Sequence, residues 1–155
     1  MTFDAIDRKL LQLLQNDSKQ TNKELSNKLN LSVTAVFERI KKLENNGVIT
    51  KYVALVKKET VEKSFVAFCH IKLSQHIQAY VVQFEKEVTN LTEVLECHHI
   101  SGDYDYLLKV LVKDMEAFRE FMVEKLTNIN HIGSTHSMFV ISEVKSTTAI
   151  PISAI

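Results

Sequence analysis

Three groups of side chains in this 155-residue chain have types and spacings that could do chemistry. The run Cys97-His98-His99 offers one thiol and two imidazoles, which are ligands for a transition metal. Asp103 and Asp105 stand beside Gly102 at a spacing that a pair of catalytic carboxylates could use. The segment from Ser32 to Lys51 carries hydroxyl and basic side chains of the kind that contact nucleic acid.

The Cys97-His98-His99 run is not expected to hold a metal. Residues 94–101 are strand-like, so Cys97 and His99 share one face of a sheet while His98 points to the other. Three ligands that diverge in this way cannot meet at one ion. The interpretation that we favour is a small buried cysteine beside interface histidines, with no metal and no cofactor.

The two aspartates near Gly102 have three interpretations. Carboxylates beside a tight glycine turn are most often turn chemistry. A catalytic pair is the second, but the sequence has no nucleophile elbow, phosphate loop or zinc signature, and we do not expect an enzyme. The third is a binding site for a zwitterion, in which turn amides take its carboxylate and an Asp takes its ammonium group.

The hydroxyl and basic side chains belong to a stretch, Thr21 to Ile49, that predicts two short helices joined by a tight turn. Thr21 and Glu24 form a capping-box pattern at the start of the first helix. Asn30 tolerates the left-handed backbone of a tight turn, and Ser32 is the expected N-cap of the second helix. A further helix precedes this pair. Other residues expected to cap or pack the three helices are Asp4, Ile6, Leu10, Leu13, Leu14, Leu25, Leu29, Val36, Ile40, Leu43 and Gly47.

This layout is that of a helix-turn-helix, whose second helix enters the DNA major groove. Residues near the start of that helix reach base edges, and later basic residues meet phosphates. The alternative is that the charges only form a solvated helix face. The residues expected at DNA are Ser32 at the helix start, Thr34, Glu38 and Arg39 near the bases, and Lys41, Lys42 and Lys51 at the backbone.

Composition limits the class of protein. Apolar residues make up 45% of the chain, and no apolar run is long enough to span a membrane, so we expect a cytoplasmic protein. The net charge is zero, but residues 1–60 hold 11 Lys and Arg against 7 Asp and Glu, a net charge of +4, and the remainder carries −4. This asymmetry indicates that the N-terminal part meets a polyanion, and with the helix-turn-helix it predicts association with the nucleoid.

The region after the helices predicts a connection between two domains. Residues 48–56 are β-branched and aromatic, which favours a strand, either a wing or a connecting strand. Residues 57–60 have no apolar periodicity and form the expected hinge. We therefore divide the chain into a helix-turn-helix domain at 1–50, a connecting strand and hinge at 51–61, and a second domain at 62–155.

The second domain alternates strand-like and helix-like runs in the order βαββαβ, which predicts a ferredoxin-like arrangement and an α+β fold. A hairpin turn is expected around Gly102. One helix presents Ile77, Tyr80, Val81, Phe84 and Val88, and the other, capped by Asp114, presents Met115, Phe118, Phe121, Met122 and Leu126. The expected strands are Phe65–Leu73, Val94–Ser101, Asp105–Val112 and Thr135–Glu143.

Both faces of this sheet are apolar. Ala67 and Ile71 would face one way on the first strand, and Val66 and Phe68 the other. Only one face can pack on the two helices, and the other is too apolar for a solvated antiparallel sheet. We infer a homodimer that packs sheet to sheet and presents two recognition helices to a two-fold operator.

Short motifs along the chain are together highly specific. They are Ile6-Asp7-Arg8, Glu24-Leu25-Ser26, Leu31-Ser32, Glu38-Arg39-Ile40, Leu43-Glu44, Gly47-Val48-Ile49, Glu96-Cys97-His98 and the run from Ser101 to Lys109. On these motifs the chain resembles the Lrp/AsnC family of leucine-responsive and asparagine-responsive transcription regulators, also called feast/famine regulators. The resemblance runs from about Phe3 to Thr147. One departure is Val33, where many relatives carry Pro at the first turn of the recognition helix, and Val is tolerated there.

The resemblance implies an N-terminal DNA-binding domain and a C-terminal domain that binds small effectors, typically amino acids. It also implies homodimers that assemble further, often to octamers around which double-stranded DNA wraps, with the effector between dimers. The positions that match the effector site are Ser101, Gly102, Asp103, Tyr104 and Asp105, facing Thr135, His136 and Ser137 of a neighbouring subunit.

The expected function is therefore that of a sequence-specific DNA-binding transcriptional regulator, whose assembly or DNA affinity is modulated by a small effector such as an amino acid. Two alternatives stay open. Siroheme decarboxylases resemble this family in both domains, and His98, His99 and His136 would suit tetrapyrrole chemistry, although an enzyme needs no basic recognition helix. A protein that organises DNA without responding to any ligand is the other alternative.

Overall fold

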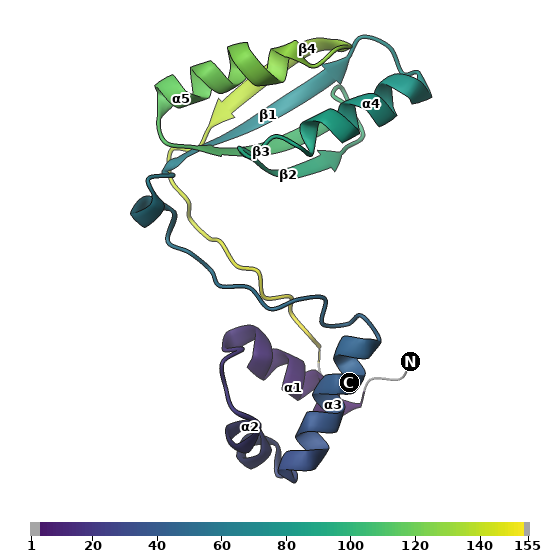
Figure 1. The fold of residues 1–155 in the computed structure, drawn as a ribbon, viewed down its shortest axis with the longest axis vertical. Helices are drawn as coiled ribbons and strands as arrows, with labels where there is room; N and C mark the ends of the chain where they lie inside the picture. The colour runs from purple at the N-terminus through teal and green to yellow at the C-terminus, as the bar shows by residue number, and fades with distance from the viewer. Residues whose placement is uncertain (1–3, 154–155) are drawn as a thin grey trace. The chain divides into compact units, whose positions relative to one another are not determined.

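The structure, a computed structural model, describes residues 4–153 and divides into two compact units. One unit contains the chain up to Leu55 together with the segment from Lys145, and the other contains Val56–Val144 (Figure 1). This division groups the segment after Val144 with the N-terminal helices, whereas the expected domain at 62–155 included it, and those domain bounds stay a prediction. Residues 1–3 and 154–155, at the outer ends of the expected domains, lie outside the description, and so does the Phe3 start of the resemblance.

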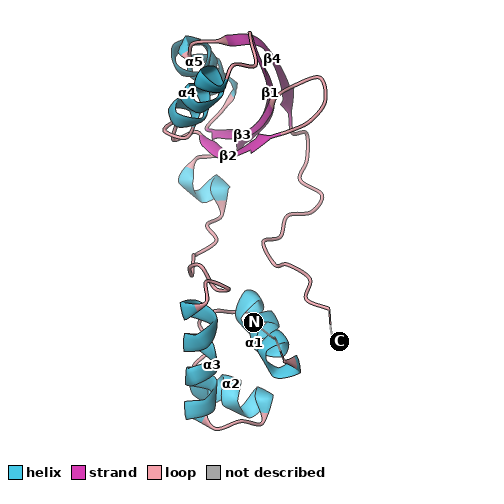
Figure 2. Ribbon diagram, turned by 90° about the vertical axis from the view of Figure 1, so that its right-hand side faces the viewer, coloured by secondary structure: helices cyan, strands magenta, loops and turns pink. Residues whose placement is uncertain are grey.

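Three helices form the N-terminal unit (Figure 2), with bounds α1 Ala5–Asn16, α2 Asn22–Leu29 and α3 Val33–Asn45. The capping box is confirmed, since Thr21 and Glu24 each accept the backbone N–H of the other. Ser32 caps α3 as predicted, by accepting the N–H of Ala35 at 3.1 Å. Asn30 adopts the left-handed backbone that the turn requires, with φ of 54°.

The core of this unit is small and follows the predicted periodicity. Its buried members are Leu10, Leu14, Leu25, Leu29, Val36 and Leu43. Ile6, Leu13 and Ile40 are half-buried against them. The core fixes one side of α3 and leaves the opposite side exposed.

The segment after α3 corrects a prediction. Residues 50–57 form no strand, and a short 3-10 helix covers Lys58–Val61 in the expected hinge. Val53 and Leu55 are 59% and 75% exposed. Strand preference in β-branched residues takes effect where a neighbouring strand completes the ladder, and no such neighbour lies beside this segment in the described part of the chain.

The C-terminal unit is a four-stranded antiparallel sheet in the order β2-β3-β1-β4, which confirms the ferredoxin-like, α+β class. Figure 2 shows its helices on one face of the sheet. No helix within residues 4–153 is long and apolar enough to cross a membrane. The elements are β1 Phe65–Leu73, α4 Gln78–Val88, β2 Val94–His99, β3 Tyr106–Val112, α5 Met115–Glu120, a π turn Phe121–Lys125, a 3-10 turn Leu126–Asn128 and β4 Ile132–Phe139.

Four strand boundaries and two helix positions differ from expectation. β2 and β3 stop short of the turn because the Ile100 N–H is donated to the carbonyl of Asp105, at 2.8 Å, within the turn itself. β4 begins at Ile132 and ends at Phe139 rather than at Glu143, because its partner strand β1 begins at Phe65 and the last ladder bond is Val140 to Val66. Ile77 and Met115 were expected on buried helix faces but start their helices and are 46% and 50% exposed.

The sheet has one covered face and one open face. The helix-covered face carries Ala67, Cys69 and Ile71 from β1, all fully buried. The open face carries the alternate residues, among them Val66, Phe68 and His70. This alternation confirms the predicted facing of the strands and leaves a partly apolar face without helices.

Candidate nucleic-acid interface and effector site

The exposed side of α3 carries three of the residues predicted at DNA. Thr34, Glu38 and Lys41 lie opposite the buried Val36 and Leu43, and all three are exposed. Residues at this spacing share one helix face. A hydroxyl, a carboxylate and an ammonium group on one face can contact base edges and phosphates of a duplex groove.

Phe37 is a candidate that the sequence analysis missed. Its ring is 44% exposed, and Nζ of Lys41 lies 5.8 Å from the ring centroid. Val33, one turn earlier, is 41% exposed. Apolar side chains beside polar ones on a recognition helix can contact the methyl group of thymine. The available signal was that Phe37 falls outside the buried stripe of α3 while being aromatic.

Arg39 makes ion pairs within the N-terminal unit. Its Nη1 donates to Asp4 Oδ2 at 2.7 Å and to Asp7 Oδ1 at 2.5 Å, and its side chain is only 26% exposed. These hydrogen bonds raise the pKa of Arg39. The Asp7 backbone N–H, and then Arg39, hold the pKa of Asp4 below its ordinary value. Arg39 therefore fastens α3 to α1, and its contact with bases stays a prediction.

The carboxylate at the centre of this contact, Asp7, is 1% exposed. Its second oxygen, Oδ2, has no hydrogen-bond partner among residues 4–153, and Nζ of Lys42 lies 3.8 Å away. Lys42 thus faces the buried carboxylate, although half of its side chain is exposed. The burial of Asp7 could have been predicted from its spacing, because Asp7 shares a helix face with the buried Leu10 and Leu14.

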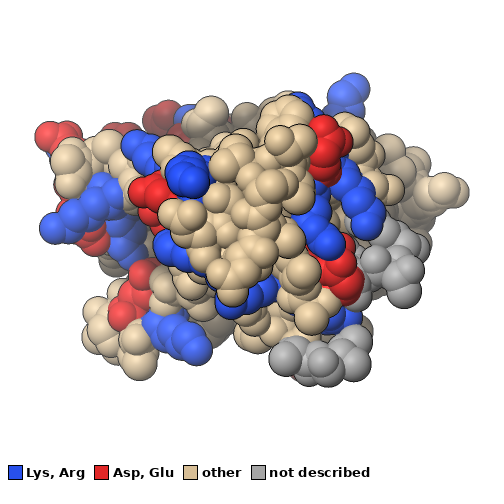
Figure 3. Space-filling model, turned by 90° about the horizontal axis from the view of Figure 1, so that it is seen from below, with Lys and Arg blue, Asp and Glu red and all other residues tan. Residues whose placement is uncertain are grey.

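Basic groups on this part of the surface are mixed with other side chains. Figure 3 shows Lys and Arg separated by acidic and uncharged residues over the face that it draws. Lys41 lies 3.6 Å from Glu44, and Lys51 is exposed beyond α3. Of the predicted cations, Lys41, Lys42 and Lys51 are exposed, and Arg39 is the least accessible.

The turn between β2 and β3 separates the two aspartates into different roles. Ser101, Gly102 and Asp103 are exposed, and Gly102 has φ of 124°, a conformation that favours glycine. Asp105 is buried, and its Oδ2 accepts the backbone N–H of Leu73 at 2.7 Å. Asp105 therefore ties the turn to β1, and Asp103 is the carboxylate of this pair that remains open to a ligand.

The predicted residues of β4 do not share one face. His136 pairs with His70 across the open face, whereas Thr135 and Ser137 point to the helix-covered side. Ser137 Oγ lies 3.5 Å from the Sγ of buried Cys69 there. Alternation along the strand therefore places His136 on the opposite face from its two neighbours, and a common effector site for the three residues stays a prediction.

Tyr104 and His136 lie near one another within one chain, and the contact of this turn with a neighbouring subunit stays a prediction. Their ring centroids are 6.3 Å apart, and His70 lies 5.0 Å from Tyr104. Nδ1 of His70 is buried and has no hydrogen-bond partner in the described range. His70 is the member of this cluster that the sequence analysis placed on the open face without assigning it a role.

The Cys97-His98-His99 run diverges as the strand period requires. His98 Nε2 lies 3.2 Å from Glu96 Oε2, while the His99 ring stacks on Tyr106 with centroids 4.7 Å apart. Burial raises the pKa of the Cys97 thiol. Within residues 4–153 no three His, Cys, Asp or Glu side chains gather in a way that could hold a metal ion.

Comparison with known proteins agrees with this geometry. Residues 66–150 match the family described as the Lrp/AsnC ligand binding domain, and residues 3–50 match the winged helix-turn-helix DNA-binding family. The leucine-responsive regulatory protein of Escherichia coli is 38% identical over 150 residues, which cover 97% of this chain and 92% of that protein.

Two solved structures extend the similarity to the whole fold. A transcriptional regulator from Neisseria meningitidis in complex with L-Met has a TM-score of 0.93 at 35% identity, with 97% of each chain covered. An AsnC family transcriptional regulator from Agrobacterium tumefaciens has a TM-score of 0.92 at 36% identity, covering 96% of this chain and 97% of that one. The chain therefore belongs to the Lrp/AsnC family of transcriptional regulators.

Proposed function

We propose that this regulator acts in the cytoplasm, associated with the nucleoid, and that an amino acid modulates its DNA affinity or its assembly. The observation that carries the proposal is one chain with an exposed recognition-helix face in one unit and an open, ligand-accessible turn in the other. The L-Met complex of the Neisseria relative supports an amino acid as the effector class. Its relatives are transcriptional regulators, and we propose no catalytic activity.

DNA is contacted in this proposal by the outward face of α3. Thr34, Phe37 and Glu38 approach base edges, while Lys41 and Lys51 meet phosphates. Lys42, shared with the carboxylate of Asp7, contributes less. The N–H groups at the Ser32 end of α3 lie at the positive end of the helix dipole and can face a phosphate.

A mobility-shift titration with the regulator's own promoter region tests this interface. Lys41→Ala should weaken binding to all sequences and lower the salt slope by about one, because one phosphate contact is lost. Glu38→Ala should instead relax the base preference at one position. Lys86→Ala, at an exposed lysine of α4 in the other unit, is the matched control. Absence of any shift at low salt would contradict DNA binding by this chain.

The effector is bound in this proposal at the turn of Ser101, Gly102 and Asp103. Backbone N–H groups of an exposed turn can take an amino-acid carboxylate, and the Asp103 carboxylate can take the ammonium group. Asp105 holds the turn in place through Leu73 and leaves its own carboxylate occupied.

A thermal-shift screen of the twenty amino acids tests this site, because a ligand that binds only the folded state raises the melting temperature. Asp103→Asn should abolish the response, and Glu116→Gln, a remote exposed carboxylate on α5, should leave it unchanged. A ligand-insensitive DNA-organising protein would be favoured if no amino acid changed the melting temperature, the DNA affinity or the assembly state.

The open face of the sheet is the proposed homodimer interface, with further assembly to an octamer. It presents Phe68, which pairs with Met138, and Leu107, which pairs with His70, and Met138 is 42% exposed. Leu107→Glu would bury charge in this interface and should give monomers in light-scattering measurements. Val82→Glu, at an exposed valine on α4, is the control. An unchanged mass for Leu107→Glu would overturn this interface.

A further inference from the structure

The outer face of α1 carries three long polar side chains that reach the C-terminal segment. Residues 8, 12 and 15 share one helix face, because they are spaced by four and three residues. All three donate to main-chain carbonyl groups. The contacts are Arg8 Nη1 to Ser153 O at 3.1 Å, Gln12 Nε2 to Ile152 O at 2.9 Å and Gln15 Nε2 to Ile150 O at 3.0 Å.

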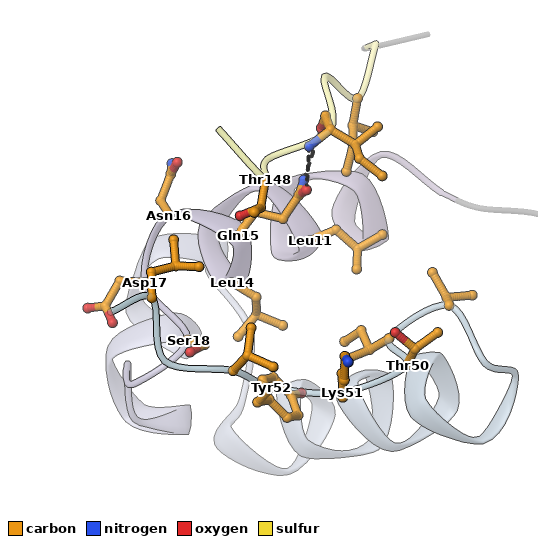
Figure 4. Close-up of a pocket in the computed structure, with 16 residues that line it drawn as sticks. Leu11, Leu14, Gln15, Asn16, Asp17, Ser18, Thr50, Lys51, Tyr52 and Thr148 are labelled. Atoms are coloured by element: carbon orange, nitrogen blue, oxygen red, sulfur yellow. Dashed lines mark hydrogen bonds between the residues drawn. The ribbon is translucent and has the colours of Figure 1, made fainter. Parts of the chain in front are cut away.

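Gln15 makes the most complete of these contacts. Besides donating to the carbonyl of Ile150, its Oε1 accepts the Ile150 N–H at 2.7 Å, as the dashed line in Figure 4 shows. A side-chain amide here pairs with a main-chain amide in the way that a neighbouring strand would. Pro151 follows and has no N–H, so this position of the segment has no backbone donor that would need a partner.

Gln15 contacts the backbone of the segment rather than its side chains. Ile150 is 73% exposed although both of its main-chain polar groups are bonded to Gln15. The segment also closes one side of an apolar groove of about 660 Å³, with Leu11 and Leu14 on the α1 side and Tyr52 across from them (Figure 4). The surface therefore fits an extended peptide with free carbonyl groups.

We propose that the outer face of α1 is a binding site for an extended peptide, and that its ligand is the chain's own segment Thr148–Ser153. This segment, the strap, is a releasable second connection of the C-terminal domain to the helix-turn-helix domain. Exposed hydrogen bonds are individually weak, so the strap can detach. Residues 140–147 tether it to β4, and a short tether gives an effective concentration in the millimolar range, which favours docking.

Docking of the strap acts on the helix to which the recognition helix is fastened. Arg39 joins α3 to Asp4 and Asp7 at the start of α1, and the strap lies along the same helix. A docked strap therefore restrains α1 and, through it, α3. Release of the strap leaves the linker at residues 56–64 as the remaining connection of the chain between the two domains.

Hydrogen exchange of the full-length protein, followed by mass spectrometry, tests the strap without DNA or effector. In Gln12→Ala/Gln15→Ala protein the amides of residues 148–153 and of α1 should exchange about fivefold faster, since the paired bonds are lost. Lys9→Ala, an exposed residue of the same helix, should leave exchange unchanged.

Gln15→Glu separates the strap from a general loss of structure. The carboxylate keeps the acceptor for the Ile150 N–H but loses the donor to the Ile150 carbonyl, so the Ile150 amide should exchange faster than in the unaltered protein but more slowly than in the double alanine variant. Unchanged exchange of residues 148–153 in the double alanine variant would overturn the proposal. Equal acceleration across α2 and α3 in Gln15→Glu would also overturn it, because that result indicates unfolding rather than release.

Discussion

The two units hold themselves together by different means. The N-terminal unit buries six apolar residues in its core, whereas the C-terminal unit buries fourteen around its sheet. The smaller core is supplemented by side-chain caps on all three helices and by the ion pairs of Arg39. A small domain cannot bury enough apolar surface to do without such polar contacts, so its DNA-binding surface rests on them.

The largest expected effect on stability comes from truncating one buried side chain in each core separately. Leu43→Ala in the N-terminal unit and Leu108→Ala in the C-terminal unit both remove a fully buried side chain and should cost about 2–5 kcal/mol. Because the first core is smaller, Leu43→Ala should abolish the melting transition of the helix-turn-helix unit and leave the other in place. Calorimetry of the two variants gives the answer. Loss of one common transition in both would show that the units do not unfold separately.

The next effect concerns the buried carboxylate of the N-terminal unit. Asp7→Ala removes one partner of Arg39 and should destabilise this unit. The loss should be no more than about 1–3 kcal/mol, because water can solvate the part-exposed guanidinium in its place. Asp7→Asn keeps one acceptor and should cost less. DNA affinity measured below the melting temperature should fall little in both. A large loss of affinity without loss of stability would show that Arg39 acts at DNA directly.

In place of such an ion pair, the C-terminal unit has a hydrogen bond from a tyrosine to a carboxylate. The Tyr106 hydroxyl donates to Glu85 Oε1 at 2.8 Å, and burial followed by this bond raises the pKa of Tyr106. Tyr106→Phe should lower the stability of this unit by about 1 kcal/mol. Tyr80→Phe, at a ring stacked on His131, is the control and should change less. Chemical denaturation gives both values.

The smallest effect is a titration at the edge of the N-terminal unit. Burial, and then the hydrogen bond from its hydroxyl to Glu44 at 3.1 Å, raises the pKa of Tyr52 to about 12. Since the folded value lies above the unfolded one of 10.0, this stabilisation is complete below pH 10 and is lost as the pH rises through about 12. Tyrosinate absorbance follows it. Tyr52→Phe should remove that late ionisation, and an ionisation of Tyr52 near 10 would contradict the contact.

Local signals predicted the helix ends, and the strand period predicted the faces of the sheet. The capping box of Thr21 and Glu24 needs only three residues of chain, so the sequence alone was sufficient. The alternation of β1 likewise follows from its own composition. The role of Arg39 was not predictable in this way, because its carboxylate partners lie more than thirty residues earlier in the chain.

The strand expected at residues 48–56 does not form, and the contacts of the C-terminal segment were not foreseen, for a related reason. Both depend on what lies beside an extended chain, and residue type does not specify that neighbour. Gln12 and Gln15 looked like ordinary solvated helix residues, since their partners are main-chain groups of Ile150 and Ile152. Backbone recognition leaves no trace in the side chains of the segment that is recognised.

The pairing of β1 with β4 also has an evolutionary and engineering meaning. The C-terminal unit is entered at Phe65 and left at Phe139, and Ala67 pairs with Phe139, so its entry and exit are adjacent. In topological terms the sheet unit is an insert within a discontinuous helical unit. Domains with adjacent ends tolerate transplantation. Residues 56–144 could therefore be exchanged for another ligand-binding module with neighbouring ends, which would place the same DNA-binding unit under a different signal.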